Sequence, residues 1–451
     1  MTTHPMPSRF VGPLLLATLL AATSFAQAPV ALTLGGAARL AAEKSAGVEA
    51  ARSRIDQADA RVRQRRAEFL PVVSGSVSDG ERTFNSASFG ITFRDPVTGR
   101  ALFDPNGEVL GPVRAWDVRG TIRQNIADFS SLERLRAARA GSSASAADLA
   151  SVAQQAAAGA AVAYIRVLRA DAQLAARVAD STLAEELLRI ARDQLSAGVG
   201  VALDVTRAQS QLAATRAQLI AYRNEQGRAR LELHRSLGLP LTTSVTLSDS
   251  LPVLATTGAI PTDVEATERA MRTRADLRAA DGQIAAANRQ LSAIRAERLP
   301  ALALYADEGT TGKSTAHLLN TYSWGLMVSF PMFDGFRREG RLDEQRSALR
   351  ELDVRRRDLA QQAAIEVSGA LLDLASAREQ LAASAERVTL AEQEVAQARD
   401  RFSAGVSGNA DAITASLGLN AARTQLVDAL AALQSSRVAL ARAQGIVTEL
   451  P

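Results

Sequence analysis

The chain has 451 residues, of which 4% are aromatic, a small fraction for a large globular core. It contains no cysteine and three histidines, which excludes thiol catalysis, disulfides and Cys/His zinc sites. The 52 Lys and Arg residues are interleaved with 48 Asp and Glu residues, a balance that argues against a nucleic-acid partner.

The first 28 residues have the pattern of a signal peptide. Arg9 precedes an apolar run from Phe10 to Ala22, and small residues follow up to Ala28. A run of about a dozen apolar residues is too short to span a bilayer. We therefore predict cleavage after Ala26 or Ala28 and export from the cytoplasm, with an N-terminal membrane anchor as the alternative. Beyond Ala28 no apolar run reaches the length of a transmembrane helix, so membrane insertion would require strands.

The sequence repeats itself after about two hundred residues. Residues 154–238 align without gaps with residues 361–445, and roughly a third of the positions are identical. We predict an internal duplication: a first repeat over residues 29–238, a linker over 239–260 and a second repeat over 261–451.

Each repeat predicts the same series of elements. A helix over 34–69 or 261–298 ends at Leu-Pro, because proline cannot continue it. A strand-rich region follows, and then a very long helix over about 132–195 or 338–402. A glycine turn leads into a return helix that ends at Gly238 or Gly445. A helix of some 64 residues is about 95 Å long, more than a globular core needs. The helices alone fit a free-standing antiparallel coiled coil equally well.

The strand candidates show alternation of apolar and polar residues. The apolar phase, which we predict to face lipid, carries Trp116, Val118, Ile122, Tyr322, Trp324, Leu326 and Val328. The opposite phase, which we predict to face a lumen, carries Asp117, Arg119 and Arg123. This pattern is typical of outer-membrane strands, and an ordinary sheet packed on a core is the alternative. Four strands cannot close a barrel, so we expect oligomerisation, and a trimer supplies twelve strands.

These features together resemble the TolC-type outer-membrane factor family of bacterial efflux and type I secretion channels. The resemblance covers residues 34–445, and it is most specific in four segments. They are Phe330-Pro331-Met332-Phe333-Asp334-Gly335, its echo at residues 124–129, and the two turns that lead to Asp204 and Asp411. It implies a mainly α protein with membrane β structure. The expected assembly is a trimeric 12-stranded outer-membrane β-barrel continuous with a 12-helix periplasmic α-barrel.

The resemblance also implies roles for residues at the two turns. The tips that meet a periplasmic adaptor would be formed by Ser196, Gly198, Val199, Ser403, Gly405 and Val406. Asp204 and Asp411 would line a periplasmic gate. Thr414 stands where some members carry a second acidic residue, and Phe402 where a tyrosine can latch the gate, so we expect a weaker latch and a less acidic pore.

The function implied is a passive exit duct without enzymatic activity, cofactor or metal. It would serve an inner-membrane pump of the RND, ABC or MFS type through a periplasmic adaptor (membrane-fusion protein), with outer-membrane lipid around its strands. The alternative is a periplasmic coiled-coil scaffold or interaction protein whose strands form a small soluble domain.

Overall fold

The protein is described from a computed structural model over residues 30–90, 94–104, 106–254 and 260–451. The predicted signal peptide (residues 1–28) lies outside this range, as do residues 255–259 of the predicted linker.

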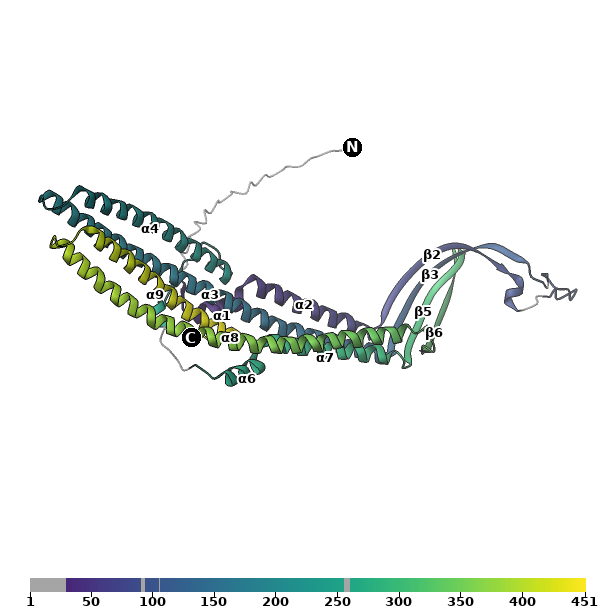
Figure 1. The fold of residues 1–451 in the computed structure, drawn as a ribbon. Coiled ribbons are helices and arrows are strands. Elements are labelled where there is room, and N and C mark those ends of the chain that lie inside the picture. Colours follow the sequence, from purple (N-terminus) through teal and green to yellow (C-terminus); the bar gives the residue numbers. More distant parts are fainter. Residues whose placement is uncertain (1–29, 91–93, 105, 255–259) are drawn as a thin grey trace, which may run out of the picture.

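The molecule is elongated, with four long strands at one end (Figure 1). At the other end lie the two turns that each connect a long helix to its return helix. The first half contains β1 (Val30–Leu32), α1 (Leu34–Lys44), α2 (Ala46–Ala67), β2 (Val72–Asn85), β3 (Val109–Ala127), α3 (Phe129–Ser196) and α4 (Ala202–Leu237). The second half contains β4 (Val245–Leu247), α5 (Leu251–Leu254), α6 (Asp263–Thr273), α7 (Ala275–Ala296), β5 (Ala301–Ser314), β6 (His317–Ser329), α8 (Arg337–Ser403) and α9 (Asn409–Ala443). Short 3-10 helices cover Ser86–Phe89 and Val447–Glu449. The elements that follow the strands thus have the predicted order, a long helix and then a return helix.

The two long helices are confirmed: α3 has 68 residues and α8 has 67. At 1.5 Å per residue each spans about 100 Å. Asp128 caps the start of α3 by accepting a hydrogen bond from the backbone N–H of Ser130 at 2.9 Å. Alanine is the most frequent buried apolar residue, so neighbouring helices pack closely along most of this length. Over the described ranges, every helix falls short of the combination of length and hydropathy that a membrane span requires.

The prediction of one continuous helix at the start of each repeat is wrong. The chain breaks at Ser45 between α1 and α2, and at Arg274 between α6 and α7, where ψ is 147° and 123°. Each break receives the end of a return helix. A Cβ atom on Gly238, after α4, would lie 2.5 Å from the Lys44 carbonyl oxygen, and one on Gly445, after α9, would lie 3.0 Å from Arg274 Cα. Consequently α4 ends against the start of α2, and α9 ends against the start of α7.

Arg274 holds the second of these junctions together. Its Nε and Nη2 donate to the two carboxylate oxygens of Asp276 at 3.1 and 2.6 Å, and its Nη1 donates to Glu366 of α8 at 2.5 Å. Nη1 also lies 3.3 Å from the carbonyl oxygen of Ala443, the last residue of α9. Burial opposes the effect, but the hydrogen bonds from Arg274 hold the pKa of Asp276 below its ordinary value. This carboxylate therefore stabilises the junction at neutral pH, and the contribution is lost as pH falls through the lowered pKa.

A second layer covers the middle of α3. Strands β1 and β4 pair in parallel, and α1 packs its buried alanines against Ala160 and Ala161 of α3. The fully buried Tyr164 of α3 has its hydroxyl 2.8 Å from the carbonyl oxygen of Leu32 and 3.0 Å from Asp249 Oδ2. The long helix is therefore fixed to the small sheet at this level.

The four long strands form one antiparallel sheet in the order β2-β3-β5-β6. In Figure 1 this sheet continues from the ends of α2, α3, α7 and α8 and curves away from the helices. Among the described residues, β2 and β6 are paired on one side only. The sheet therefore has two free edges.

Replacing Arg274 by alanine should weaken the junction between α9 and α7, because two partly buried carboxylates lose their partner. We expect Arg274→Ala to lower the free energy of unfolding by about 2 kcal/mol, measured by denaturant titration of the helical circular dichroism signal in detergent. Arg272→Ala is the matched control, since its side chain is 75% exposed and 3.9 Å from Glu268. It should change stability by less than about 0.5 kcal/mol. Equal losses in the two variants would contradict this role of Arg274.

Candidate functional site

The two turns at the free end of the helices have the same backbone geometry. The N–H of Val199 donates to the carbonyl of Gln194 at 3.1 Å, and that of Val406 donates to the carbonyl of Arg401 at 3.0 Å. Gly198 (φ 76°) and Gly405 (φ 70°) adopt the left-handed conformation that this helix ending requires. The serines contribute as well, because Ser196 and Ser403 donate to backbone carbonyls at 2.8 and 2.9 Å.

Apolar side chains project from both turns. Val199 is 79% exposed and Val406 is 70% exposed. On the first turn Val201 and Leu203 are exposed as well. The six residues predicted to contact an adaptor therefore lie together at one end of the molecule, as far from the sheet as the chain extends (Figure 1). Within this chain, these valines have little apolar contact.

The two predicted gate aspartates differ in their surroundings. Asp411, in the first turn of α9, is exposed. Asp204, in the first turn of α4, is only 9% exposed and lies 3.8 Å from Arg207. Thr414 is exposed, and its hydroxyl donates to the carbonyl of Ala410 in its own helix at 2.9 Å. The aspartates are thus equivalent in sequence but not in accessibility.

Phe402 is part of the packing between the two turns. Its side chain is 1% exposed and lies in a cluster with Leu187, Leu188 and Leu212 of the first repeat. Its backbone carbonyl accepts a hydrogen bond from Gln194 Nε2 at 2.6 Å. The ring therefore joins α8 to α3 and α4 by apolar contact, without a side-chain hydrogen bond.

Sequence reasoning missed two residues that connect the turns, Gln194 and Asn409. The buried Asn409 donates from Nδ2 to the carbonyl of Asp204 at 2.7 Å, which ties α9 to α4. In the aligned repeats Gln194 matches Arg401 and Asn409 matches Ala202. A signal was available for Asn409 only, as a polar residue next to a turn where the other copy has alanine, since Gln194 is matched by another polar residue.

A buried charge cluster joins α3 to α9 farther from the turns. The carboxylate of Asp180 is fully buried, with Arg177 and Arg423 each 3.2 Å from one of its oxygens. Arg177 also donates to Thr424 at 2.8 Å, and its guanidinium lies over the ring of Tyr222 in α4. Burial raises the pKa of Asp180, against the attraction of the two arginines. Such a cluster fixes the relative positions of three helices, because removing one partner leaves a buried charge unpaired.

The strand register puts all seven predicted lipid-facing residues on one face of the sheet. Ile122 pairs with Ala306, which pairs with Trp324, and Leu304 pairs with Leu326. The predicted lumen-facing residues Asp117, Arg119 and Arg123 share the opposite face, since residues paired across strands point the same way. The apolar face also carries Asp79 opposite Trp116 and Glu308 opposite Tyr322, which the alternation pattern did not reveal.

The polar face contains a network around Arg119. Its Nε and Nη2 donate to Asp117 at 3.2 and 3.1 Å, and Nη2 also donates to Thr321 at 3.1 Å. Its Nη1 pairs with Asp307, which in turn accepts a hydrogen bond from Ser323. The network spans β3, β5 and β6 and pairs the charges of Asp117, Arg119 and Asp307 on this face.

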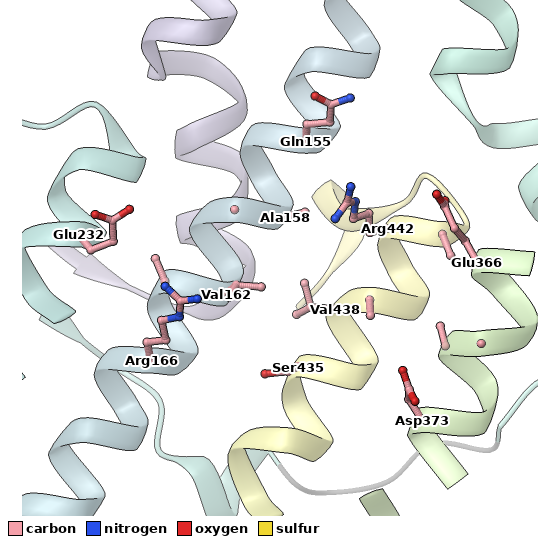
Figure 2. A pocket seen from close by; sticks show the side chains of 16 residues that line it. Gln155, Ala158, Val162, Arg166, Glu232, Glu366, Asp373, Ser435, Val438 and Arg442 are labelled. Carbon is pink, nitrogen blue, oxygen red and sulfur yellow. The ribbon is translucent and has the colours of Figure 1, made fainter. Parts of the chain in front are cut away.

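A recess of about 700 Å³ lies between α3, α8 and α9, near the middle of the helices (Figure 2). Glycines and alanines line part of it, among them Gly159 and Gly369. Arg166 and Asp373, at matching positions of the two repeats, line it from α3 and α8. The recess lies on the side of α3 opposite α1. Tyr164 and Leu168 belong to the buried cluster that contains alanines of α1. Arg166 is two residues from each of them, and two residues along a helix point in nearly opposite directions. The helical layer is thus covered on one side and hollowed on the other.

Comparison with known proteins identifies relatives over most of the chain. The sequence matches the family model described as Outer membrane efflux protein over residues 37–239 and 266–446. The toluene efflux pump outer membrane protein TtgF of Pseudomonas putida is 29% identical over 237 residues, which are 51% of this chain and 48% of that protein. The probable efflux pump outer membrane protein SepC, from another strain of Pseudomonas putida, matches over the same length with the same identity. The chain therefore spans about half the length of the curated relatives it matches.

Solved structures share the fold. The outer-membrane channel OprN superimposes with a TM-score of 0.73 at 22% identity, covering 91% of this chain and 89% of OprN. CusC has a TM-score of 0.73 at 19% identity, with 91% of each chain covered. The open state of the Neisseria gonorrhoeae MtrE outer membrane channel has a TM-score of 0.70 at 18% identity, covering 91% of this chain and 88% of MtrE.

Gln194→Ala combined with Asn409→Ala should let the two turns separate. Each substitution removes one hydrogen bond between the repeats, a contribution of about 1 kcal/mol each. The chain has no cysteine, so spin labels can be attached at Val199→Cys and Val406→Cys alone. We expect a broader distance distribution between the labels, measured by pulsed electron paramagnetic resonance with labelled chain diluted in unlabelled chain. Thr414→Ala is the control, since among the described residues its hydroxyl bonds only its own helix. An unaltered distribution in the double variant would refute the role of these bonds.

Proposed function

The chain belongs to the outer membrane efflux protein family, and from this we propose that it is the exit duct of a tripartite efflux or type I secretion system. The duct conducts substrates passively from an inner-membrane pump, through a periplasmic adaptor, to the outside of the cell. The observation that carries this proposal is the division of one chain into two parts. One end is a sheet with an apolar face and free edges, and the other is a set of helices about 100 Å long.

The free edges of the sheet support a trimer. Backbone groups at a strand edge cannot remain unpaired in lipid, and four strands are too few to close a barrel. In three copies, β6 of each chain pairs with β2 of the next to give a closed barrel of twelve strands. The apolar face with Trp324 and Leu326 then meets outer-membrane lipid, and the face with Arg119 lines the lumen.

The exposed valines support adaptor binding at the turns. Val199 and Val406 lie on turns of the same geometry, so a trimer presents six similar apolar sites around its periplasmic end. A periplasmic adaptor with a complementary apolar surface binds there and connects the duct to the pump, which supplies the energy.

The exposed Asp411 supports a cation-binding gate. Three copies form a ring of like charge near the turns, and such rings favour cations in a pore. Asp204 contributes less, because its side chain is nearly buried. Phe402 and the bonds of Gln194 and Asn409 then hold the gate closed.

Cell fractionation tests the location and the assembly. We expect the mature protein in detergent-extracted outer membrane, as a trimer that dissociates on heating when analysed by electrophoresis. A periplasmic scaffold would instead be released as a soluble monomer by osmotic shock. That result would refute the duct.

Single-channel recording tests the gate. Asp411→Ala should raise the divalent-cation concentration needed for half-maximal block by about tenfold, because the ring loses three charges. Asp400→Ala is the control, since this carboxylate is 76% exposed but lies in the last turn of α8, before the Gly405 turn. If block is the same in Asp411→Ala and in wild type, Asp411 does not line the gate.

A further inference from the structure

Helices α4 and α8 form two opposite edges of the helical layer near the turns (Figure 1). Both edges expose large aliphatic side chains. On α8, Ile365 and Leu372 are each 72% exposed, and on α4, Ile220 and Leu231 are 68% and 54% exposed. Strand β6 leads into α8, and α2, which is stacked on α4, leads into β2. The helical layer and the sheet therefore end along the same two edges.

The internal repeat indicates what covers the exposed positions of α8. In the alignment without gaps, Ile365 and Leu372 match Ala158 and Ile165 of α3. Those two residues are only 5% and 2% exposed. Positions that are open to solvent on one long helix are thus closed on the other, because α3 has α9 beside it.

The exposed positions of α4 have buried counterparts in the same contact. Ile220 and Leu231 match Val427 and Val438 of α9, which are 9% and 1% exposed. Both valines lie in one buried cluster with Ile165 of α3. The residues exposed on α8 and α4 are therefore the counterparts of those that α3 and α9 bury against each other.

We propose that α8 of one copy packs against α4 of the next copy as α3 packs against α9 within the chain, and that this contact is the first to separate when the duct opens. We call the contact the seam, and it contains Ile365 and Leu372 on one side and Ile220 and Leu231 on the other. The proposal rests on the proposed trimer, and it assigns a second copy of the chain to both edges. Copies joined edge to edge in this way close into a ring.

The seam lacks hydrogen bonds that join α3 to α9. Within the chain, Asp428 of α9 accepts a hydrogen bond from Arg169 Nε at 2.8 Å and one from Gln173 Nε2 at 2.9 Å. At the seam the position of Asp428 is occupied by Ala221 of α4, whose side chain accepts no hydrogen bond. These two bonds therefore have no counterpart between copies.

An ion pair of the internal contact is also missing from the seam. Within the chain, Arg423 of α9 lies between two carboxylates, 3.2 Å from Asp180 of α3 and 3.4 Å from Glu392 of α8. The side chain of Asp180 is fully buried, so this pair contributes to holding α3 and α9 together.

The matching positions at the seam bring two arginines together. Arg216 of α4 keeps one carboxylate, Glu185 at 3.0 Å, but the position of Asp180 is taken by Arg387 of α8. Arg387 donates to Gln425 at 2.6 Å, which leaves its charge in place. An attractive pair inside the chain is thus replaced by a repulsive pair between copies. Opening then begins at the seam, while α3 and α9 remain joined.

Disulfide mapping of the full mature protein in detergent tests where copies meet. The chain has no cysteine, so Ala221→Cys/Gln380→Cys puts one cysteine on each side of the seam, at the positions that match Asp428 and Gln173. On oxidation we expect linked dimers and trimers in denaturing electrophoresis without reductant. Arg223→Cys/Gln380→Cys is the matched control, because Arg223 is exposed but points to nearly the opposite side of α4 from Ala221. The control should give no linked copies.

Two results would count against the seam. A trimer in which Ala221→Cys/Gln380→Cys forms no links, or equal yields in this variant and the control, would overturn it. A wild-type protein that is monomeric in detergent would instead refute the proposed duct, a result distinct from those two.

Charge exchange tests whether opening begins at the seam. Arg387→Asp gives the seam the counterpart of the pair between Asp180 and Arg423. We expect single-channel recording in planar bilayers to show an open probability at least about tenfold below wild type, because three seams each gain an ion pair. Adding Arg216→Asp makes the two charges alike again, so Arg216→Asp/Arg387→Asp should regain at least the wild-type open probability. If Arg387→Asp opens as often as wild type, or the double variant as rarely as Arg387→Asp, opening does not begin at the seam.

Discussion

The close approach of helices through small side chains is the constraint on which the rest of the structure depends. The long helices and the return helices form a layer that is one helix thick over much of its length. Such a layer has no deep core, so its stability must come from contacts repeated along the helices. Alanine, the most frequent buried apolar residue, provides many of them, and glycine does so where backbones come closest. A Cβ atom on Gly282 of α7 would lie 3.0 Å from Cα and Cβ of Ala144 in α3. Large aromatic residues would force these helices apart. The low aromatic content is therefore a consequence of helix spacing, and the two tryptophans lie on the sheet.

Two shorter helices, placed end to end, pack beside each long helix. Helices α4 and α2 lie along α3, and α9 and α7 lie along α3 and α8, with an interruption halfway. The interruptions admit α1, α6 and the small β1–β4 sheet as a second layer, which is fixed to α3 through Tyr164. The two junctions differ chemically. Ser45 has a buried hydroxyl without a partner among the described residues, whereas Arg274 binds two carboxylates and a helix end. The repeats thus share backbone geometry but not the interactions that stabilise it.

Features determined by local periodicity could be predicted from the sequence. The long helices, the glycine turns and the alternation that gives Trp116 and Trp324 one face of the sheet all follow from the spacing of residues along one segment. Features that depend on partners distant in sequence could not. The breaks at Ser45 and Arg274 occur in segments with good helical composition, because the ends of other helices abut them. Asp204 and Asp411 look equivalent in the aligned repeats, yet it is Asp204 that lies 3.8 Å from Arg207 and whose backbone carbonyl accepts a hydrogen bond from Asn409. The ion pairs Arg298–Glu339 and Arg341–Glu297 at the base of the strands are likewise tertiary.

The end-to-end junctions have a mechanical consequence. A continuous helix resists stretching along its axis, because consecutive backbone hydrogen bonds must break before it lengthens. Two abutting helices resist compression, but under tension they are joined only by side chains such as Arg274. A pulling force applied at the turns is therefore transmitted to the sheet by α3 and α8, each unbroken over its whole length. The shorter helices beside them can slide or tilt at their junctions while α3 and α8 still connect the turns to the sheet.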